Sequence, residues 1–172
     1  MKEVRLLGVI IGPERIKIEE KKVKDVLDWP TLQGVKDVQK FLKLANYYYQ
    51  FIKNFTMIAR LLHDMVKKDK KWKWTERQKE AFRKLKKKFM KEPILVALDL
   101  DKKMRMKVDT SDYATGEVLS MECGDRQWRP EVFLSKSLNE IERNYDKEIL
   151  AVIRGLENWR HLLKGAKFKF EV

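Results

Sequence analysis

The feature that constrains this chain most is a long run of apolar residues at helical spacing. Over about five helical turns of 3.6 residues, one face carries Val35, Val38, Phe41, Leu42, Ala45, Tyr48 and Ile52. Such a face is stable only when other elements cover it. Similar but shorter runs follow Glu19 and, after a break near Asn54, begin again at Phe55. Residues 19–67 are therefore predicted to form a small helical unit.

Alternating patterns on both sides of this unit predict strands. An apolar segment, 4–11, is interrupted by Gly8 and closed by Gly12-Pro13, and a short return strand follows it. Beyond Pro93, residues 104–109 alternate apolar with charged. Further strands are predicted at 118–121 and 131–134, a helix from about 144 to 164 with a buried apolar stripe, and a fourth strand beginning at 168. The expected fold class is α/β, of the α+β kind.

Basic residues indicate a polyanionic partner. The formal net charge is +13, and residues 60–92 alone hold 14 basic and 5 acidic side chains. Lysine and arginine bind nucleic acid without sequence preference by neutralising phosphates. The lysines proposed as phosphate contacts are Lys67, Lys68, Lys70, Lys71, Lys73, Lys84, Lys87 and Lys88. The alternative is that these lysines only form a solvated surface.

Two tryptophans lie within the basic segment, just before a predicted helix. Thr75 and Gln78 have the spacing of a capping box, so the helix is expected to begin after Thr75. Trp72 and Trp74, with lysines around them, are able to stack on bases. The same pattern also arises when aromatic residues belong to the core of an amphipathic helix, and the sequence leaves both interpretations open.

Composition excludes several classes of protein. The single cysteine, Cys123, cannot form an internal disulfide or a cysteine-based zinc site, and His63 and His161 have no metal-ligand spacing. No apolar run is long enough to span a membrane, and no signal peptide is recognisable. An intracellular protein, cytoplasmic or nuclear, is expected.

Several motifs occur in an order that identifies a family. Trp29-Pro30 is followed by Phe41-Leu42-Lys43-Leu44-Ala45-Asn46-Tyr47-Tyr48, and later by Val108-Asp109-Thr110-Ser111-Asp112 and Lys147-Glu148-Ile149-Leu150-Ala151. This order resembles the Pol polyprotein of gypsy-type long-terminal-repeat retrotransposons. The resemblance implies the end of a reverse transcriptase palm at 1–17 and a thumb-like helical region at 18–71. It also implies a connection helix and a truncated ribonuclease H-like domain, a partial mixed sheet with flanking helices, at 72–172.

The same resemblance implies a chemistry and the residues for it. Ribonuclease H cleaves the RNA of an RNA–DNA hybrid with two Mg²⁺ ions held by carboxylates. Asp109 and Glu148 match the first two catalytic and metal-binding positions. The third is expected just beyond Val172, and Glu171 comes too early to replace it. Glu117 also departs from the family by placing a charge in a strand expected to be buried.

Three functions follow as hypotheses. The first is a retroelement fragment without catalysis, with no held Mg²⁺, that keeps affinity for RNA–DNA hybrid or double-stranded nucleic acid. The second is a Mg²⁺-dependent hybrid ribonuclease completed by another segment or chain. The third is a host-adopted interaction module or a relic, in which an incomplete sheet edge leads to self-association. No membrane partner is expected.

Overall fold

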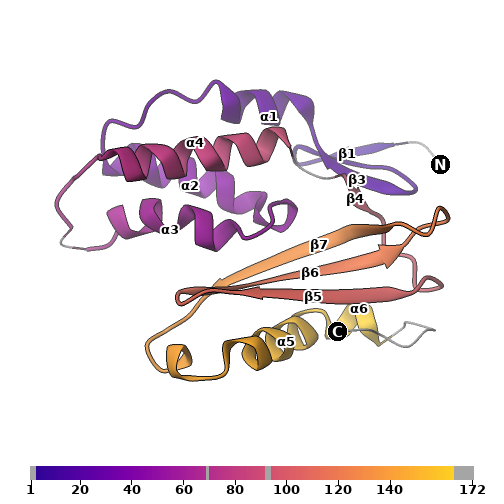
Figure 1. Ribbon diagram of the computed structural model, residues 1–172. Helices are drawn as coiled ribbons and strands as arrows, with labels where there is room; N and C mark the ends of the chain where they lie inside the picture. Colours follow the sequence, from indigo (N-terminus) through magenta and orange to yellow (C-terminus); the bar gives the residue numbers. More distant parts are fainter. Residues whose placement is uncertain (1–2, 69, 92–93, 165–172) are drawn as a thin grey trace.

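A three-stranded sheet lies between two helical layers in the structure, a computed structural model that describes residues 3–68, 70–91 and 94–164 (Figure 1). One layer holds most of the helices: α1 (Glu20–Leu27), α2 (Val35–Tyr47), the short 3-10 helix η1 (Tyr49–Phe51), α3 (Phe55–Met65) and α4 (Glu76–Met90). The other layer holds η2 (Glu142–Asn144), α5 (Lys147–Asn158) and α6 (Arg160–Leu163). A second sheet, which has four strands but is smaller because they are short, lies beside the first layer.

The smaller sheet corrects one expectation. Residues 4–11 form a hairpin rather than a single strand, with β1 (Val4–Leu6) antiparallel to β2 (Val9–Ile11). The turn between them is made by Leu7 and Gly8, with φ of 50° and 82°. Positive φ at both turn residues gives the twist that a two-residue hairpin needs. β3 (Arg15–Ile18) extends the sheet, and β4 (Leu95–Val96) pairs with β3 from far along the chain.

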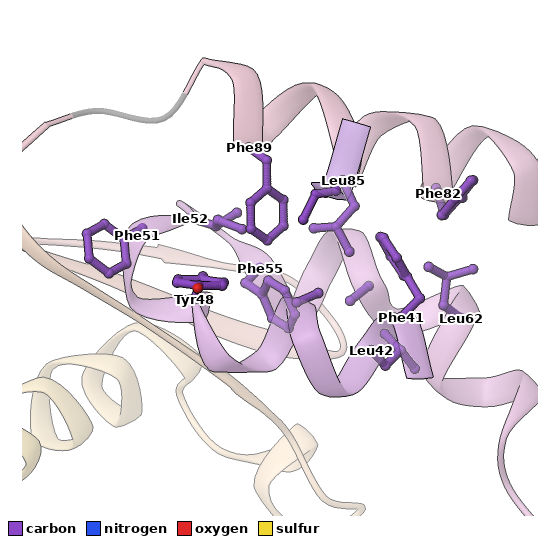
Figure 2. Packing of buried hydrophobic residues seen from close by; sticks show 14 of the residues in the cluster. Phe41, Leu42, Tyr48, Phe51, Ile52, Phe55, Leu62, Phe82, Leu85 and Phe89 are labelled. Atoms are coloured by element: carbon purple, nitrogen blue, oxygen red, sulfur yellow. The ribbon is translucent and has the colours of Figure 1, made fainter. Parts of the chain in front are cut away.

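The apolar stripe of residues 35–52 is buried as predicted, except for the half-buried Val35, although α2 ends at Tyr47 and the last two members, Tyr48 and Ile52, flank η1. Its members meet the inner faces of α3 and α4 (Figure 2). Phe41 packs edge-to-face on Phe82 with ring centroids 4.7 Å apart, and Tyr48 packs on Phe89 at 6.1 Å. Edge-to-face pairs of this kind stabilise the core beyond the area that they bury. The helical unit therefore has a well-packed core that includes α4.

The larger sheet consists of β5 (Met104–Thr110), β6 (Ala114–Glu122) and β7 (Trp128–Ser137), antiparallel in the order β5-β6-β7. Its three strands are longer than the patterns predicted. The predicted fourth strand at 168–172, which a mixed sheet would need, lies outside the described residues. Phe133 of β7 joins the core of the helical unit, whereas Met106 of β5 lies in a second core with Trp159. The two faces of the sheet thus contribute to two different cores.

The predicted buried stripe of the last long helix is confirmed only in part: Trp159 is buried and Val152 and Leu163 are half-buried, but the other three members are not. Ile149, Ile153 and Leu156 are exposed, at 59, 46 and 38% of their full surface. The buried face of α5 instead carries Ala151, Arg154 and Gly155. A side chain at Gly155 would overlap the sulfur of Met106, so this helix approaches the sheet through its smallest residues. The shape of the sheet surface, and not hydrophobicity alone, decides which face is buried.

The core of the helical unit crosses the predicted division at residue 71. Leu85 of α4 and Phe133 of β7 share that core with Phe41, which lies in the predicted thumb-like region. Of the helices in the described ranges, none is both long enough and apolar enough to cross a membrane.

Candidate nucleic-acid interface

A groove with an apolar floor and a basic rim runs between α3 and α4. Its floor is formed by Met57, Ile58, Leu61 and Ala81, and its volume is 540 Å³. The basic side chains along it are Lys53, Arg77, Lys84 and Lys88. A neighbouring hollow of 420 Å³ shares three of the basic residues and adds Lys87 and Lys91 at its edge, with Phe133 of the sheet as a wall. Together these hollows form a continuous basic surface, called here the α3–α4 groove.

The rim is basic because of the spacing of residues on α4. Arg77, Lys84 and Lys88 are separated by seven and four residues, close to two turns and one turn, which places them along one side of the helix. The neighbouring side carries Phe82, Leu85 and Phe89, which are buried in the core. Burial of that side fixes the direction in which the rim points. The helix begins as predicted, with the Gln78 Oε1 accepting a hydrogen bond from the Thr75 N–H at 3.2 Å.

The rim lysines differ in how far their charge is neutralised. Lys84 Nζ lies 2.8 Å from a Glu80 carboxylate oxygen. Lys87 and Lys88 have no ion pair within 4.0 Å among residues 3–68, 70–91 and 94–164. Lys86 faces elsewhere: its Nζ donates to the Trp29 carbonyl at 2.8 Å, and burial lowers its pKa. Lys87 and Lys88 are therefore the lysines of α4 best placed to attract a phosphate.

The remaining predicted lysines lie in the connection between α3 and α4, at one end of the groove (Figure 1). Each of Lys67, Lys68, Lys70, Lys71 and Lys73 is exposed. Lys67 Nζ pairs with Asp64 at 2.6 Å.

Sequence patterns missed two residues of the groove. Helical spacing back from Lys84 would have found Arg77, whereas Lys53 lies in a loop and has no local signal.

Asp109 lies at the end of β5, where the pattern placed it, but it faces the helical unit. Its Oδ2 accepts a hydrogen bond of 2.6 Å from Asn54 Nδ2. Asn54 precedes α3 in the left-handed conformation, with φ of 58°, which asparagine tolerates better than most residues. Gly116 lies opposite Asp109 in the sheet, and a side chain there would overlap the Asn54 Oδ1. Asn54, Asp109 and Gly116 form a close junction between the helices and the sheet, called here the Asn54 junction.

A second pair of hydrogen bonds strengthens the contact at the start of α3. The Thr56 N–H donates to Ser135 Oγ at 3.1 Å, and the Thr56 hydroxyl donates to the Ser135 carbonyl at 2.9 Å. The helix that forms one wall of the groove is thereby fixed to β7 as well as to β5.

Glu148 lies on the other side of the sheet from Asp109. It is exposed in the first turn of α5, which packs against the face of β5 that carries Met106. Asp109 is three residues from Met106 and therefore points to the opposite face. Among the residues that the structure describes, no three histidine, cysteine or acidic side chains are close enough to hold a metal ion. The described residues thus do not fit a two-metal centre, which needs several converging carboxylates.

Glu117 is buried, as the sequence indicated. It is 3% exposed on the face of β6 toward α5, and neither carboxylate oxygen has a hydrogen-bond partner in the described chain. Burial raises its pKa to about 7. The Thr115 hydroxyl, Arg154 and Lys136 oppose this rise, although the hydroxyl makes no hydrogen bond of normal geometry with the carboxylate. Thr115 instead accepts a hydrogen bond of 3.1 Å from Arg154 Nη1.

Comparison with known proteins begins with a family model. Residues 74–170 match the model described as an RNase H-like domain found in reverse transcriptase. The chain is also 31% identical over 173 aligned positions to the transposon Tf2-3 and Tf2-4 polyproteins of Schizosaccharomyces pombe. These alignments cover 99% of the chain but only 13% of each polyprotein. The chain thus spans about an eighth of the length of these relatives.

Solved structures show the same fold. The foamy viral protease-reverse transcriptase dRH in complex with ds DNA superposes with a TM-score of 0.80, covering 100% of this chain and 30% of its own. The foamy viral protease-reverse transcriptase in complex with RNA/DNA hybrid superposes with a TM-score of 0.78, covering 99% and 23%. Sequence identity is 18% in both comparisons, so these likenesses establish the fold alone.

Proposed function

The chain belongs to the family of RNase H-like domains found in reverse transcriptases, and its relatives are Pol polyproteins of gypsy-type retrotransposons. From this we propose that it binds duplex nucleic acid without cleaving it. The ligand is a double-stranded DNA or an RNA–DNA hybrid, and the binding surface is the α3–α4 groove. The observation that carries the proposal is the rim of Lys53, Arg77 and Lys88 over an apolar floor.

Charge supports binding to the nucleic-acid backbone. The α4 wall of the groove lies within residues 60–92, whose excess of basic over acidic side chains is nine. Phosphate contacts of this kind position a duplex but read no sequence. The protein therefore grips duplexes of many sequences, and the ions displaced from the phosphates make the binding sensitive to salt.

Relatives support the choice of ligand. The titles of the two foamy viral structures name ds DNA and RNA/DNA hybrid as the bound partners of those proteins. The whole of this chain has the fold of part of each protein. A shared fold, together with a basic groove, favours a double-stranded ligand for this chain as well.

The absence of cleavage rests on the two family carboxylates. Asp109 and Glu148 descend from metal ligands, but they lie on opposite faces of the sheet, and Asp109 is engaged by Asn54. In this proposal Asp109 fixes the helical unit to the sheet and holds no Mg²⁺. Glu148 remains a solvated side chain at the start of α5.

One experiment tests both halves of the proposal. A fluorescently labelled RNA–DNA hybrid is incubated with the protein in Mg²⁺, and binding and strand cleavage are followed in the same samples. We expect the anisotropy to rise with protein concentration while the RNA strand stays intact. An anisotropy that does not rise even at low salt would contradict the binding. Cleavage by the wild type that Asp109→Asn abolishes would contradict the absence of catalysis.

A further inference from the structure

We propose that Trp72 is a stacking platform for an unpaired nucleobase at the end of a duplex held in the α3–α4 groove. The proposal deepens the proposed function, because it names a single-stranded extension as part of the ligand. Its site lies in the connection between α3 and α4, which is outside the groove itself.

Trp72 and Trp74 differ in burial although they lie side by side. Their rings are parallel within 1°, with centroids 5.7 Å apart. Trp74 is half-buried and packs edge-to-face on Phe82 of α4 at 6.2 Å. Trp72 is 38% exposed. The core therefore holds Trp74, and Trp74 in turn supports one face of Trp72. Of the two interpretations left open above, Trp74 takes the core role and Trp72 does not.

The tryptophan pair lies directly before α4. Residues 71–75 have no regular structure and lead directly into α4. The side chains of Trp72 and Trp74 nevertheless project to the same side of this segment, since their rings stack on each other. A flat aromatic surface held in a fixed orientation loses little entropy when a base stacks on it.

Charge complementarity identifies the ligand as a nucleotide. Between Val66 and Thr75 the chain has five lysines and one aspartate. Lys70, Lys71 and Lys73 are exposed around the tryptophan pair. An exposed aromatic ring among lysines binds a base through its π face and the adjoining phosphates through charge. An uncharged lipid or an apolar peptide would gain nothing from the second interaction.

Position in the fold links the platform to the duplex. The connection joins the end of α3 to the beginning of α4, and these two helices form the walls of the groove. A duplex that lies along the groove therefore passes or ends close to this connection. A base inside a duplex is stacked on both of its neighbours, whereas an unpaired base in an extension offers a free face to Trp72. The ligand that fits both sites is a duplex with a short overhang.

The test compares a blunt RNA–DNA hybrid with the same hybrid carrying a short overhang on either strand. For the wild type, we expect the overhang at one end to tighten binding by about tenfold, since one stacked base contributes this much. Trp72→Ala should lose that gain and keep the wild-type affinity for the blunt hybrid. Tyr145→Ala, which removes an exposed aromatic ring on the far side of the sheet, should keep the gain.

Fluorescence separates this proposal from the proposed function. A single-stranded oligothymidylate should quench the tryptophan emission of the wild type, and Trp72→Phe should remove most of that quenching, even if the blunt hybrid fails to bind. Near-ultraviolet circular dichroism checks that the variants are folded. The platform is overturned if the overhang brings no gain in affinity, if Trp72→Ala retains that gain, or if Trp72→Phe retains the quenching.

Discussion

At the scale of single residues, the junction between the helical unit and the sheet depends on Asn54. Its amide donates to Asp109, its backbone is left-handed, and Gly116 leaves room for its Oδ1. The sequence placed Asp109 correctly at a strand end, because alternation is a local signal. It could not reveal Asn54 as the partner, because the two residues are 55 positions apart and nothing local links them.

Substitution of Asn54 tests this junction. Asn54→Ala loses the hydrogen bond. It also places alanine in the left-handed region, which alanine tolerates less well than asparagine does. We expect the free energy of unfolding to fall by about 1–2 kcal/mol in urea denaturation. Asn54→Gly, which accepts that backbone conformation, should lose less. An alanine variant as stable as the wild type would contradict the role of this contact.

Gly116→Ala tests the same junction from the sheet side. The new methyl group displaces the Asn54 side chain, so the variant is expected to lose about as much stability as the Asn54–Asp109 hydrogen bond contributes, about 1 kcal/mol. In an Asn54→Ala background the same substitution should cost clearly less, because no side-chain amide remains to be displaced. Equal costs in the two backgrounds, from urea denaturation, would show that the residues are not coupled.

Burial of Glu117 predicts a pH dependence of stability. Its pKa is raised to about 7 in the folded protein, whereas an unfolded glutamate titrates near its ordinary value of about 4.3. The folded state therefore binds this proton more tightly than the unfolded state does. The stabilisation that the bound proton gives is complete below about pH 4.3 and is lost as the pH rises through about 7. Thermal unfolding temperatures should decline over this window.

Two variants test which carboxyl groups cause this decline in unfolding temperature. Glu117→Gln keeps the shape without ionising, so it should flatten the decline and raise stability near pH 8. Glu131 is a second contributor, because burial also raises its pKa to about 7. Glu131→Gln should therefore remove a separate share. The slope of unfolding temperature against pH is then compared between the wild type and a variant that carries both substitutions. If this slope is the same between pH 5 and 8, these carboxylates are not the cause of the decline.

At the scale of elements, α4 and α5 show what periodicity predicts and what it misses. The capping box placed the beginning of α4 correctly, because both of its residues lie within one turn. α5 begins at Lys147, three residues later than expected. Asp146 caps it by accepting hydrogen bonds of 3.1 Å from the N–H groups of Glu148 and Ile149. Its buried face was predicted only in part, because Ala151, Gly155 and the buried Arg154 suit that part of the sheet better than Ile149 does.

The side of α4 that lines the groove gives a graded prediction for binding. Lys88→Ala should weaken hybrid binding more than Lys84→Ala, because Glu80 already neutralises part of the Lys84 charge. Removal of one phosphate contact should also reduce the slope of log affinity against log salt by about 0.9. Fluorescence anisotropy at several salt concentrations measures both quantities.

A control for this series removes charge elsewhere. Lys102 and Lys103 precede β5, away from the groove, and pair with Asp99 and Glu122. Lys102→Ala with Lys103→Ala should leave the salt slope close to that of the wild type. If this pair lowers affinity as much as Lys87→Ala with Lys88→Ala, binding follows total charge and not the groove.

At the scale of the whole molecule, the sheet has the helical unit on one face and α5 on the other (Figure 1). The sequence predicted both groups of elements and their family. It could not predict that α4 and β7 complete the core of the helical unit, because that core depends on contacts between distant residues. For the same reason, helical spacing found the rim on α4 but not the contribution of Lys53 from a loop.

Self-association through a sheet edge stays a prediction. Among the described strands, none pairs with the outer edge of β5, and Ile149, Ile153 and Leu156 are exposed on the adjoining α5. An open edge beside an apolar surface favours contact between copies. Light scattering over a range of concentrations should show a rising mean mass that Ile153→Glu with Leu156→Glu suppresses. A monomer at all concentrations would count against it.

The dependence of hybrid affinity on salt tests the central claim most directly. If the α3–α4 groove grips the phosphate backbone, the wild type should show a slope of log affinity against log salt of about −3 or steeper, as expected for several phosphate contacts. Lys87→Ala with Lys88→Ala should make that slope clearly shallower. A slope near zero for the wild type, or one that these substitutions leave unchanged, would contradict the account.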